Sequence, residues 1–228
     1  MEDGKARLTV NAATGVCTLE GRIDRIDEWA EGGYLRVIDY KRGGRRLALD
    51  AVYHGLSLQL PVYLAAAMKK RGEQSAGVYY FGLDEGIVPS QSTDANEIDR
   101  KRREGFRLSG LAPDDPELLA AQSPNYPEVL NVRATKTGVL VKGTLATDAG
   151  GFRALMNRAL EKAGEHLDGI REGLAQAAPI RFRQQFSCSL CDWRGVCLFD
   201  ERMDGHRVRR FEDMTGAEVL EKLKLEEK

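Results

Sequence analysis

The order of strand-like and helix-like segments in the N-terminal third of the chain most restricts the fold. Two short apolar runs flank the turn at 13–15 and predict a β-hairpin, whose second strand we expect to continue through Asp27. A third strand is predicted over 34–41, a helix over 53–70 and a buried strand over 76–83. This β-β-β-α-β order predicts an α/β fold, a central mixed β-sheet flanked by helices.

The remaining segments are predicted with less regular patterns. Pro61 is expected in the first turns of its helix, where a missing N–H matters least. The helix over 151–176 has an apolar face made by Phe152, Leu155, Ala159, Ala163, Leu167 and Ile170. The other predicted elements are a charged helix at 97–103, a turn and short helix at 113–119, a peripheral hairpin of 129–132 with 138–142, and a tail helix at 215–228.

Composition places the chain in the class of soluble globular proteins. It has 228 residues, 42% of them hydrophobic and 30% charged, enough for one domain with a sizeable core. It has no apolar run of the roughly 20 residues that span a bilayer, and no signal-peptide pattern at Met1–Lys5. We therefore expect a cytoplasmic protein with no membrane partner. The net charge of −1 argues against a large non-specific DNA footprint but allows a local basic groove.

Asp39 and Lys41 form the sharpest chemical pattern. Side chains alternate along a strand, so these two share one face while Tyr40 points to the other. A carboxylate can bind Mg²⁺, and a neighbouring ammonium can orient a water or balance charge during phosphodiester hydrolysis. An isolated Asp-x-Lys is also common as a surface salt bridge, which is the alternative.

A second carboxylate is needed, because Mg²⁺ prefers near-octahedral oxygen ligation. Asp24 would lie across from Asp39 if the two strands pair through the turn at 31–33. Asp27 competes for this place, but it lies three residues further on and would face the opposite side of a regular strand. We prefer Asp24.

Gln59 and Tyr63 add a third element on the predicted helix. They are four residues apart and share a helix face. The glutamine could hold the attacking water, and the tyrosine could support it or contact DNA. An ordinary polar helix start and a buried aromatic residue are the alternative.

Together these motifs resemble the RecB-family nucleases of the PD-(D/E)XK superfamily. The matching strings are Gly21-Arg22-Ile23-Asp24, Asp39-Tyr40-Lys41 and Gln59-Leu60-Pro61-Val62-Tyr63. Within that family the chain is most similar to the C-terminal nuclease domains of the AddB subfamily. The resemblance implies a PD-(D/E)XK core over 1–186, with a peripheral insertion at about 84–149, followed by a cysteine knuckle and tail over 187–228.

The resemblance also implies roles for these residues. Asp24, Asp39 and the main-chain carbonyl of Tyr40 would bind Mg²⁺, Lys41 would be the catalytic lysine, and Gln59 and Tyr63 would match the family's Q-x-x-x-Y motif. The implied activity is that of a deoxyribonuclease, an exonuclease cutting single-stranded DNA from unwound duplex ends. It would work with an AddA-like subunit in a helicase–nuclease for double-strand-break repair.

Three of the four cysteines are close together, at Cys188, Cys191 and Cys197. Thiolates at this spacing favour an iron–sulfur cluster or Zn²⁺ over disulfides in a reducing compartment. The resemblance implies a 4Fe-4S cluster whose fourth cysteine comes from upstream of the nuclease core. Cys17 lies too near Asp24 to match it and is expected to be a small apolar strand residue. A labile cluster, a substitute ligand and free thiols all remain open, and we expect the cluster to be absent or incomplete here.

A second departure concerns a helix that precedes the first strand in many family members and carries a histidine or acidic group. None of His54, His166 and His206 matches that position. Both departures lead us to expect a fragment of a larger protein, and whether such a fragment is active when isolated stays open.

The basic residues give a weaker signal. Lys5, Arg7, Arg181, Arg183 and the runs 100–103 and 206–210 could follow phosphates, although few aromatic residues lie between them. Solvated charged faces explain them equally well. A non-catalytic DNA-binding or interdomain scaffold is the main alternative function, and the intact Asp39 and Lys41 argue against it. A zinc-ribbon-like module ranks lower, because it ignores the first 100 residues.

Overall fold

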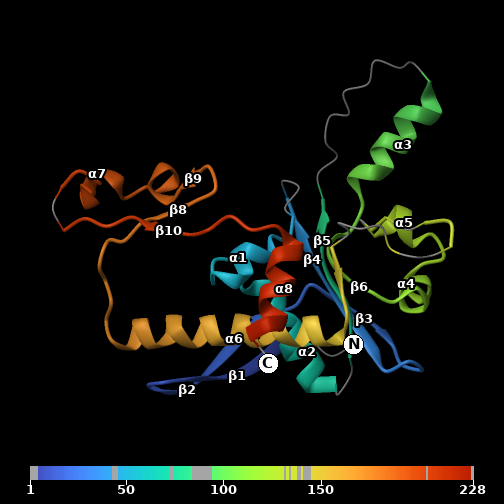
Figure 1. Cartoon of the computed structure of the whole chain (residues 1–228), viewed down its shortest axis with the longest axis horizontal. Helices are drawn as coiled ribbons and strands as arrows, with labels where there is room; N and C mark the ends of the chain where they lie inside the picture. The colour runs from blue at the N-terminus through green and yellow to red at the C-terminus, as the bar shows by residue number, and fades with distance from the viewer. Residues whose placement is uncertain are drawn as a thin grey trace.

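A five-stranded mixed sheet lies at the centre of the molecule (Figure 1). The computed structural model describes residues 5–42, 46–71, 74–83, 94–130, 132–133, 135–137, 140, 145–203 and 205–226. In sheet order, the strands are Arg25–Trp29 (β3), Tyr34–Lys41 (β4), Gln74–Gly82 (β5), Ser109–Pro113 (β6) and Ala146–Thr147 (β7). Only β4–β5 and β6–β7 pair in parallel. The predicted α/β class with a mixed sheet is confirmed.

The N-terminal hairpin forms a separate two-stranded sheet. It consists of β1 (Lys5–Ala12) and β2 (Gly15–Arg22). The predicted continuation of the second strand through Asp27 is wrong, because the chain leaves the hairpin after Arg22 and changes sheets. Ile23 turns inward and is 4% exposed, while the Asp24 carboxylate bonds to the backbone of β4. These two contacts interrupt the strand.

Two helices replace the single helix predicted over 53–70. They are α1 (Leu49–Tyr53) and α2 (Gln59–Arg71). Gly55 has a φ of +80°, and the amides of Leu56 and Ser57 both donate to the Ala51 carbonyl, which closes α1. Helix α2 then starts afresh at Gln59. Pro61 lies in its first turn, as predicted.

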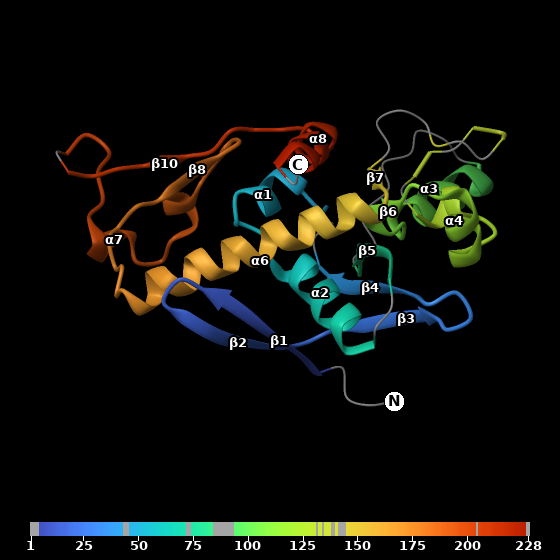
Figure 2. The same cartoon turned by 60° about the horizontal axis from the view of Figure 1, so that its bottom comes forward.

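Helix α6 (Ala149–Arg171) is the longest element and organises the main core. It packs against β1 and against helices α1, α2 and α8 (Gly216–Glu226), as Figure 2 shows. The predicted helix was five residues too long, since the chain turns at Gly173 with a φ of +69°. Ile170 is 74% exposed, so its predicted place on the buried face is wrong. The last turn of α6 extends beyond the core.

The peripheral segment contributes α3 (Ala95–Gly105), α4 (Pro116–Gln122) and α5 (Tyr126–Val129). The predicted helices at 97–103 and 113–119 correspond to α3 and α4. Val129 ends a helix and Leu130 forms a lone bridge with Leu108, so the first arm of the predicted hairpin is wrong. In the second arm, 138–139 and 141–142 lie outside the described residues. Strands β6 and β7 were not predicted.

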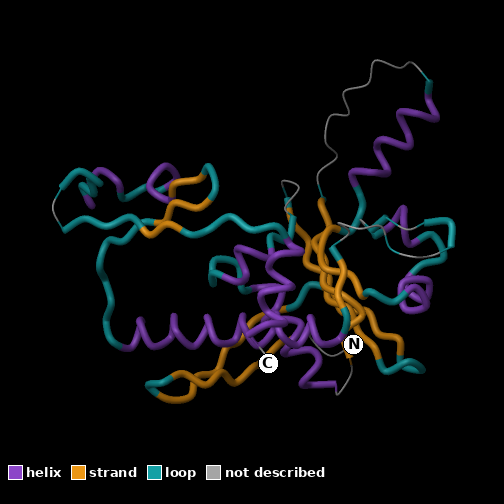
Figure 3. Tube along the Cα trace, in the orientation of Figure 1, coloured by secondary structure: helices purple, strands orange, loops and turns teal. Residues whose placement is uncertain are grey.

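Residues 180–210, which we call the cysteine lobe, lie to one side of the central sheet (Figure 3). The lobe is built from small elements: β8 (Ile180–Phe182), β9 (Gln185–Phe186), the 3₁₀ turn η1 (Ser187–Leu190), α7 (Arg194–Cys197) and β10 (Arg209–Arg210). The chain then returns to the main body as α8. None of the helices in the described ranges is long and apolar enough to cross a membrane.

Apolar side chains cover both faces of β4 and β5. On one face, the main core joins the hairpin to α1, α2, α6 and α8 and includes Val37, Leu60 and Phe152. On the other face, a smaller core around Tyr79 and Leu119 lies under α4. The two central strands are therefore held from both sides, and the side chains at their carboxyl ends have fixed positions.

Candidate functional site

Asp39 and Lys41 lie side by side at the carboxyl end of β4. The Lys41 Nζ atom is 2.7 Å from Asp39 Oδ2, and the Asp39 side chain is only 3% exposed. Burying a carboxylate is costly unless a cation compensates its charge, and Lys41 supplies that cation. Oδ2 nevertheless accepts no hydrogen bond within the described part of the chain, so its ion pair with Lys41 leaves bonding capacity unused.

Gln59 completes the surroundings of the ammonium. As the first residue of α2, it accepts a hydrogen bond from Lys41 Nζ at 2.9 Å through Oε1. The ring of Tyr80 on β5 lies beneath, with its centroid 5.9 Å from Nζ. Sequence reasoning missed Tyr80, because only the pairing of β5 with β4 brings it there. The ammonium is thus oriented by a carboxylate, an amide and a ring.

Asp24 joins this group through the backbone. Its Oδ2 atom accepts a hydrogen bond from the Tyr40 amide at 3.0 Å. In the β3–β4 register Arg25 pairs with Ile38, which places Asp24 opposite Asp39, as expected. Asp24 is exposed whereas Asp39 is buried, so the carboxylate pair has one side toward solvent.

Asp27, the competing candidate, is engaged elsewhere. It accepts hydrogen bonds from Arg25 at 2.7 Å and Arg36 at 2.8 Å. Partial burial raises the pKa of Asp27, but these two hydrogen bonds outweigh burial and leave the pKa below its usual value. Two guanidinium partners leave this carboxylate poorly suited to a second cation.

Tyr63 packs against β2 and has no described bond to the carboxylates. A Cβ on Gly21 would lie 2.9 Å from Tyr63 Cε1 and 3.1 Å from the hydroxyl oxygen. The absence of a side chain at Gly21 therefore allows α2 to approach the hairpin closely. Since Gln59 lies one turn earlier, this contact also fixes the helix end that holds Lys41.

The oxygen atoms at this site suit a hard divalent cation. Mg²⁺ commonly takes one or two carboxylates and keeps several waters. Asp24 and Asp39 provide two carboxylates, one with a buried oxygen that lacks a hydrogen bond, and the Tyr40 carbonyl lies in the same strand. Within the described ranges, no group of three or more His, Cys, Asp or Glu side chains is arranged to hold a metal. Any cation would thus rely on the carboxylate pair, a backbone oxygen and water.

The three clustered cysteines do not form a ligand set in this arrangement. Cys188 lies in η1, Cys191 follows it, and Cys197 ends α7; all three are free thiols, the last two exposed. Cys17 lies apart on β2, where its Sγ accepts a hydrogen bond from Arg171. The iron–sulfur site therefore stays a prediction.

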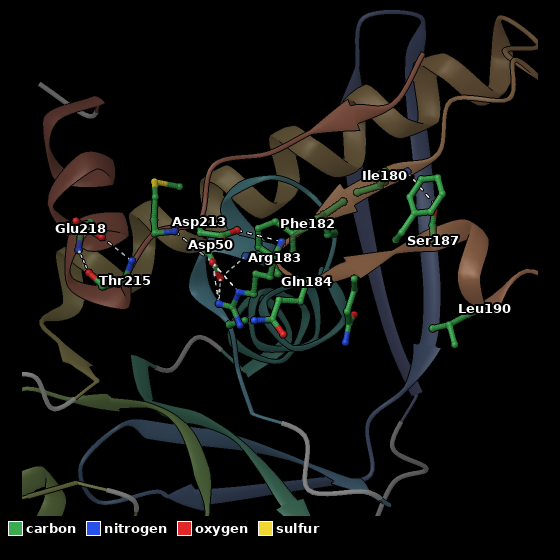
Figure 4. Close-up of a pocket in the computed structure, with 16 residues that line it drawn as sticks. Asp50, Ile180, Phe182, Arg183, Gln184, Ser187, Leu190, Asp213, Thr215 and Glu218 are labelled. Carbon is green, nitrogen blue, oxygen red and sulfur yellow. Dashed lines mark hydrogen bonds and ion pairs between the residues drawn. The ribbon is translucent and has the colours of Figure 1, made fainter. Parts of the chain in front are cut away.

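A cavity of about 1130 Å³ lies between α1, the β8–β9 turn and the segment before α8 (Figure 4). None of the five candidate catalytic residues lines it. At its base the guanidinium of Arg183 pairs with both oxygens of Asp50, which is 1% exposed. Sequence reasoning missed Asp50, since its partner is 133 residues away. Because this contact fastens the cysteine lobe to α1, Arg183 serves structure here rather than phosphate binding.

Comparisons with known proteins agree with the geometry. A family model described as the PD-(D/E)XK nuclease superfamily matches residues 2–198. Proteins named as one of the subunits of an ATP-dependent helicase/deoxyribonuclease are similar over most of the chain. The one from Moorella thermoacetica is 36% identical over 87% of this chain, and the one from Desulforudis audaxviator is 33% identical over 93%. The chain covers 18% and 19% of their lengths, so it spans about a fifth of the curated relatives it matches.

Proposed function

Because this chain belongs to the PD-(D/E)XK nuclease superfamily, we propose that it hydrolyses the phosphodiester backbone of DNA at the carboxyl end of β4. The observation that carries this proposal is the Lys41 ammonium, held between Asp39 Oδ2 at 2.7 Å and Gln59 Oε1 at 2.9 Å beside Asp24. Hydrolysis adds water across a phosphorus–oxygen bond, leaving a phosphate on one fragment and a hydroxyl on the other. Negative charge grows on the phosphoryl oxygens meanwhile, and a fixed ammonium stabilises it.

The roles of the residues follow from their positions. Lys41 contacts the scissile phosphate or its attacking water, while Gln59 keeps the ammonium in place. Asp24, Asp39 and the Tyr40 carbonyl would hold Mg²⁺, and the bound cation would polarise the phosphate and acidify water. Tyr63 positions the start of α2 through its contact with Gly21.

The relatives suggest the setting of this reaction. Their name makes them part of an ATP-dependent helicase/deoxyribonuclease with more than one subunit. We propose that this chain is the nuclease part of such a subunit in the cytoplasm and acts as an exonuclease on single strands from unwound duplex ends. An AddA-like subunit would be its partner. Cys188, Cys191 and Cys197 would join a fourth cysteine from elsewhere in the whole protein around a 4Fe-4S cluster.

The test is cleavage of end-labelled single-stranded DNA with Mg²⁺ or with EDTA. We expect cutting only with Mg²⁺, and we expect Lys41→Ala to slow it by about 100-fold or more, the scale of losing one charge-stabilising donor. Lys69→Ala is the matched control, because that exposed lysine lies near the far end of α2.

Two results would count against the proposal. Equal cutting by Lys41→Ala and the unmodified chain would place the chemistry elsewhere or reveal a contaminating nuclease. If no protein cuts while DNA still binds, the non-catalytic scaffold becomes the better description.

A further inference from the structure

Three aromatic rings form a ladder on the opposite face of the strand ends that carry Asp39 and Lys41. Tyr40 and Phe81 are register partners on β4 and β5, and their rings meet edge to face with centroids 5.7 Å apart. Phe106, just after α3, stacks on Phe81 with centroids 6.2 Å apart and an interplanar angle of 26°. The ladder runs from the strand ends out to the base of α3 (Figure 1).

Burial of the lower core does not account for the outer end of this ladder. Phe81 packs against the smaller core, but Phe106 lies outside that cluster and is 37% exposed. Leu83, directly after β5, is 52% exposed. The strand ends therefore present an aromatic and apolar surface to solvent beside the proposed catalytic residues.

Cationic side chains border the ladder. At one end Arg25 donates to the Tyr40 hydroxyl through Nη1 at 3.5 Å, and its side chain is 49% exposed. Arg42 is exposed and directly follows Lys41. At the other end, Lys101, Arg102 and Arg103 occupy the last turns of α3, just before Phe106. Rings bordered by arginine and lysine suit a polyanion that carries flat rings.

We propose that unpaired bases of single-stranded DNA stack on the Tyr40–Phe81–Phe106 ladder while the bordering cations contact their phosphates. Stacking of this kind requires a free base face, which a duplex hides inside its base stack. Because Tyr40 lies between Asp39 and Lys41 in β4, a strand held on the ladder passes the catalytic face of the same strand. This inference rests on the proposed nuclease function and names the form of DNA that the site accepts.

Binding without cleavage tests the ladder directly. The probes are a labelled oligothymidylate of about 16 nucleotides and an abasic strand of equal length, which keeps the phosphates but lacks the bases. Fluorescence anisotropy in EDTA gives the affinity for each. We expect Phe106→Leu, which keeps an apolar side chain but loses the ring, to weaken oligothymidylate binding by roughly 5- to 150-fold and to leave abasic binding unchanged.

A second variant guards against misfolding. Phe106→Trp should retain the affinity, and the fluorescence of the new tryptophan should be quenched by oligothymidylate but not by the abasic strand. The matched control is Trp29→Leu, which removes a 44% exposed ring stacked on Tyr34 at the opposite end of β4. It should bind both probes like the unmodified chain.

The outcomes separate this inference from the nuclease proposal. An equal loss on both probes, or no loss with Phe106→Leu, would overturn the ladder even if the chain still cuts DNA. The same holds if the unmodified chain fails to distinguish the two probes, and the exposed rings would then fit a protein partner better. If Phe106→Leu acts as expected but nothing is cut with Mg²⁺, the ladder stands and the nuclease proposal fails.

Discussion

At the scale of single residues, one ammonium group connects elements distant from each other in the sequence. Lys41 on β4 meets Asp39 on its own strand, Gln59 on α2 and the Tyr80 ring on β5. Each neighbour restricts the ammonium in a different direction, and the side chain is 22% exposed. A flexible lysine is thereby held before any phosphate arrives, which lowers the entropy lost in reaching the reactive geometry.

Gln59→Leu tests this orientation. Leucine keeps a similar apolar size but cannot accept the hydrogen bond from Lys41, so we expect the ammonium to lose one fixed direction. Single-turnover cleavage of single-stranded DNA should slow by about 10- to 100-fold, with the affinity measured in EDTA nearly unchanged. Gln184→Leu, in the turn between β8 and β9, is the control. Equal rates for the two variants would show that Gln59 does not position the lysine.

The sequence predicted part of this site from local rules. Alternation along a strand placed Asp39 and Lys41 on one face, and pairing through a short turn placed Asp24 opposite Asp39. The contact between Gln59 and Lys41 was not predictable, since it depends on how α2 lies across the sheet. Spacing showed only that Gln59 and Tyr63 share a face, whereas in the structure one meets the lysine and the other meets Gly21.

At the scale of elements, a carboxylate clamp attaches the N-terminal hairpin to α6. Asp168 accepts hydrogen bonds from the amides of Ala13 at 2.9 Å and Thr14 at 2.8 Å, and from the Thr14 hydroxyl. The hydroxyl bond is the main reason that the pKa of Asp168 is below its usual value. Arg171, one turn later, donates to the Val16 carbonyl.

This clamp should make the hairpin acid-sensitive. A carboxylate whose pKa is lowered by folding stabilises the fold above its unfolded pKa, and this contribution fades as pH falls through the folded pKa. We expect Asp168→Asn to lower Tm at neutral pH and to reduce the fall in Tm between neutral pH and about pH 3. Asp192→Asn, in the exposed part of the cysteine lobe, is the control. An unchanged pH dependence in Asp168→Asn would contradict the clamp.

The errors in predicting elements share one physical origin. Apolar periodicity shows that a segment is buried but not where the chain turns, so it joined β2 to β3 and α1 to α2. Both breaks depend on long-range contacts: Asp24 with the Tyr40 amide, and α1 with the body of the protein. Strands β6 and β7 were missed because five and two residues are too few for a period to emerge.

At the scale of the whole molecule, the C-terminal tail is part of the main core. Helix α8 buries Val219, Leu220 and Leu223 against the cluster that also contains Phe152 and Val37. The chain leaves this core at the end of α6, forms the cysteine lobe and then returns. The predicted boundary between 186 and 187 stays a prediction, and unfolding experiments can examine it.

Leu223→Ala should destabilise the whole chain. Leu223 is 2% exposed, and truncating a buried leucine costs about 2–5 kcal/mol of unfolding free energy. Urea unfolding followed by circular dichroism should show one transition at a lower midpoint. Leu225→Ala, at a position 63% exposed, should change stability by less than about 0.5 kcal/mol. Two separate transitions, with only the smaller affected, would instead make α8 part of an independent unit.

The alternation of β4 also limits how sequences of this kind can change in length. Asp39 and Lys41 face the proposed reaction and Tyr40 faces the aromatic ladder, so an insertion or deletion of one residue within β4 would exchange the two faces. The carboxylate and the ammonium would then lie among the rings, and the tyrosine would take their place. Length variation is therefore expected in the turns that flank β4, at 30–33 and after Lys41, and not in the strand itself.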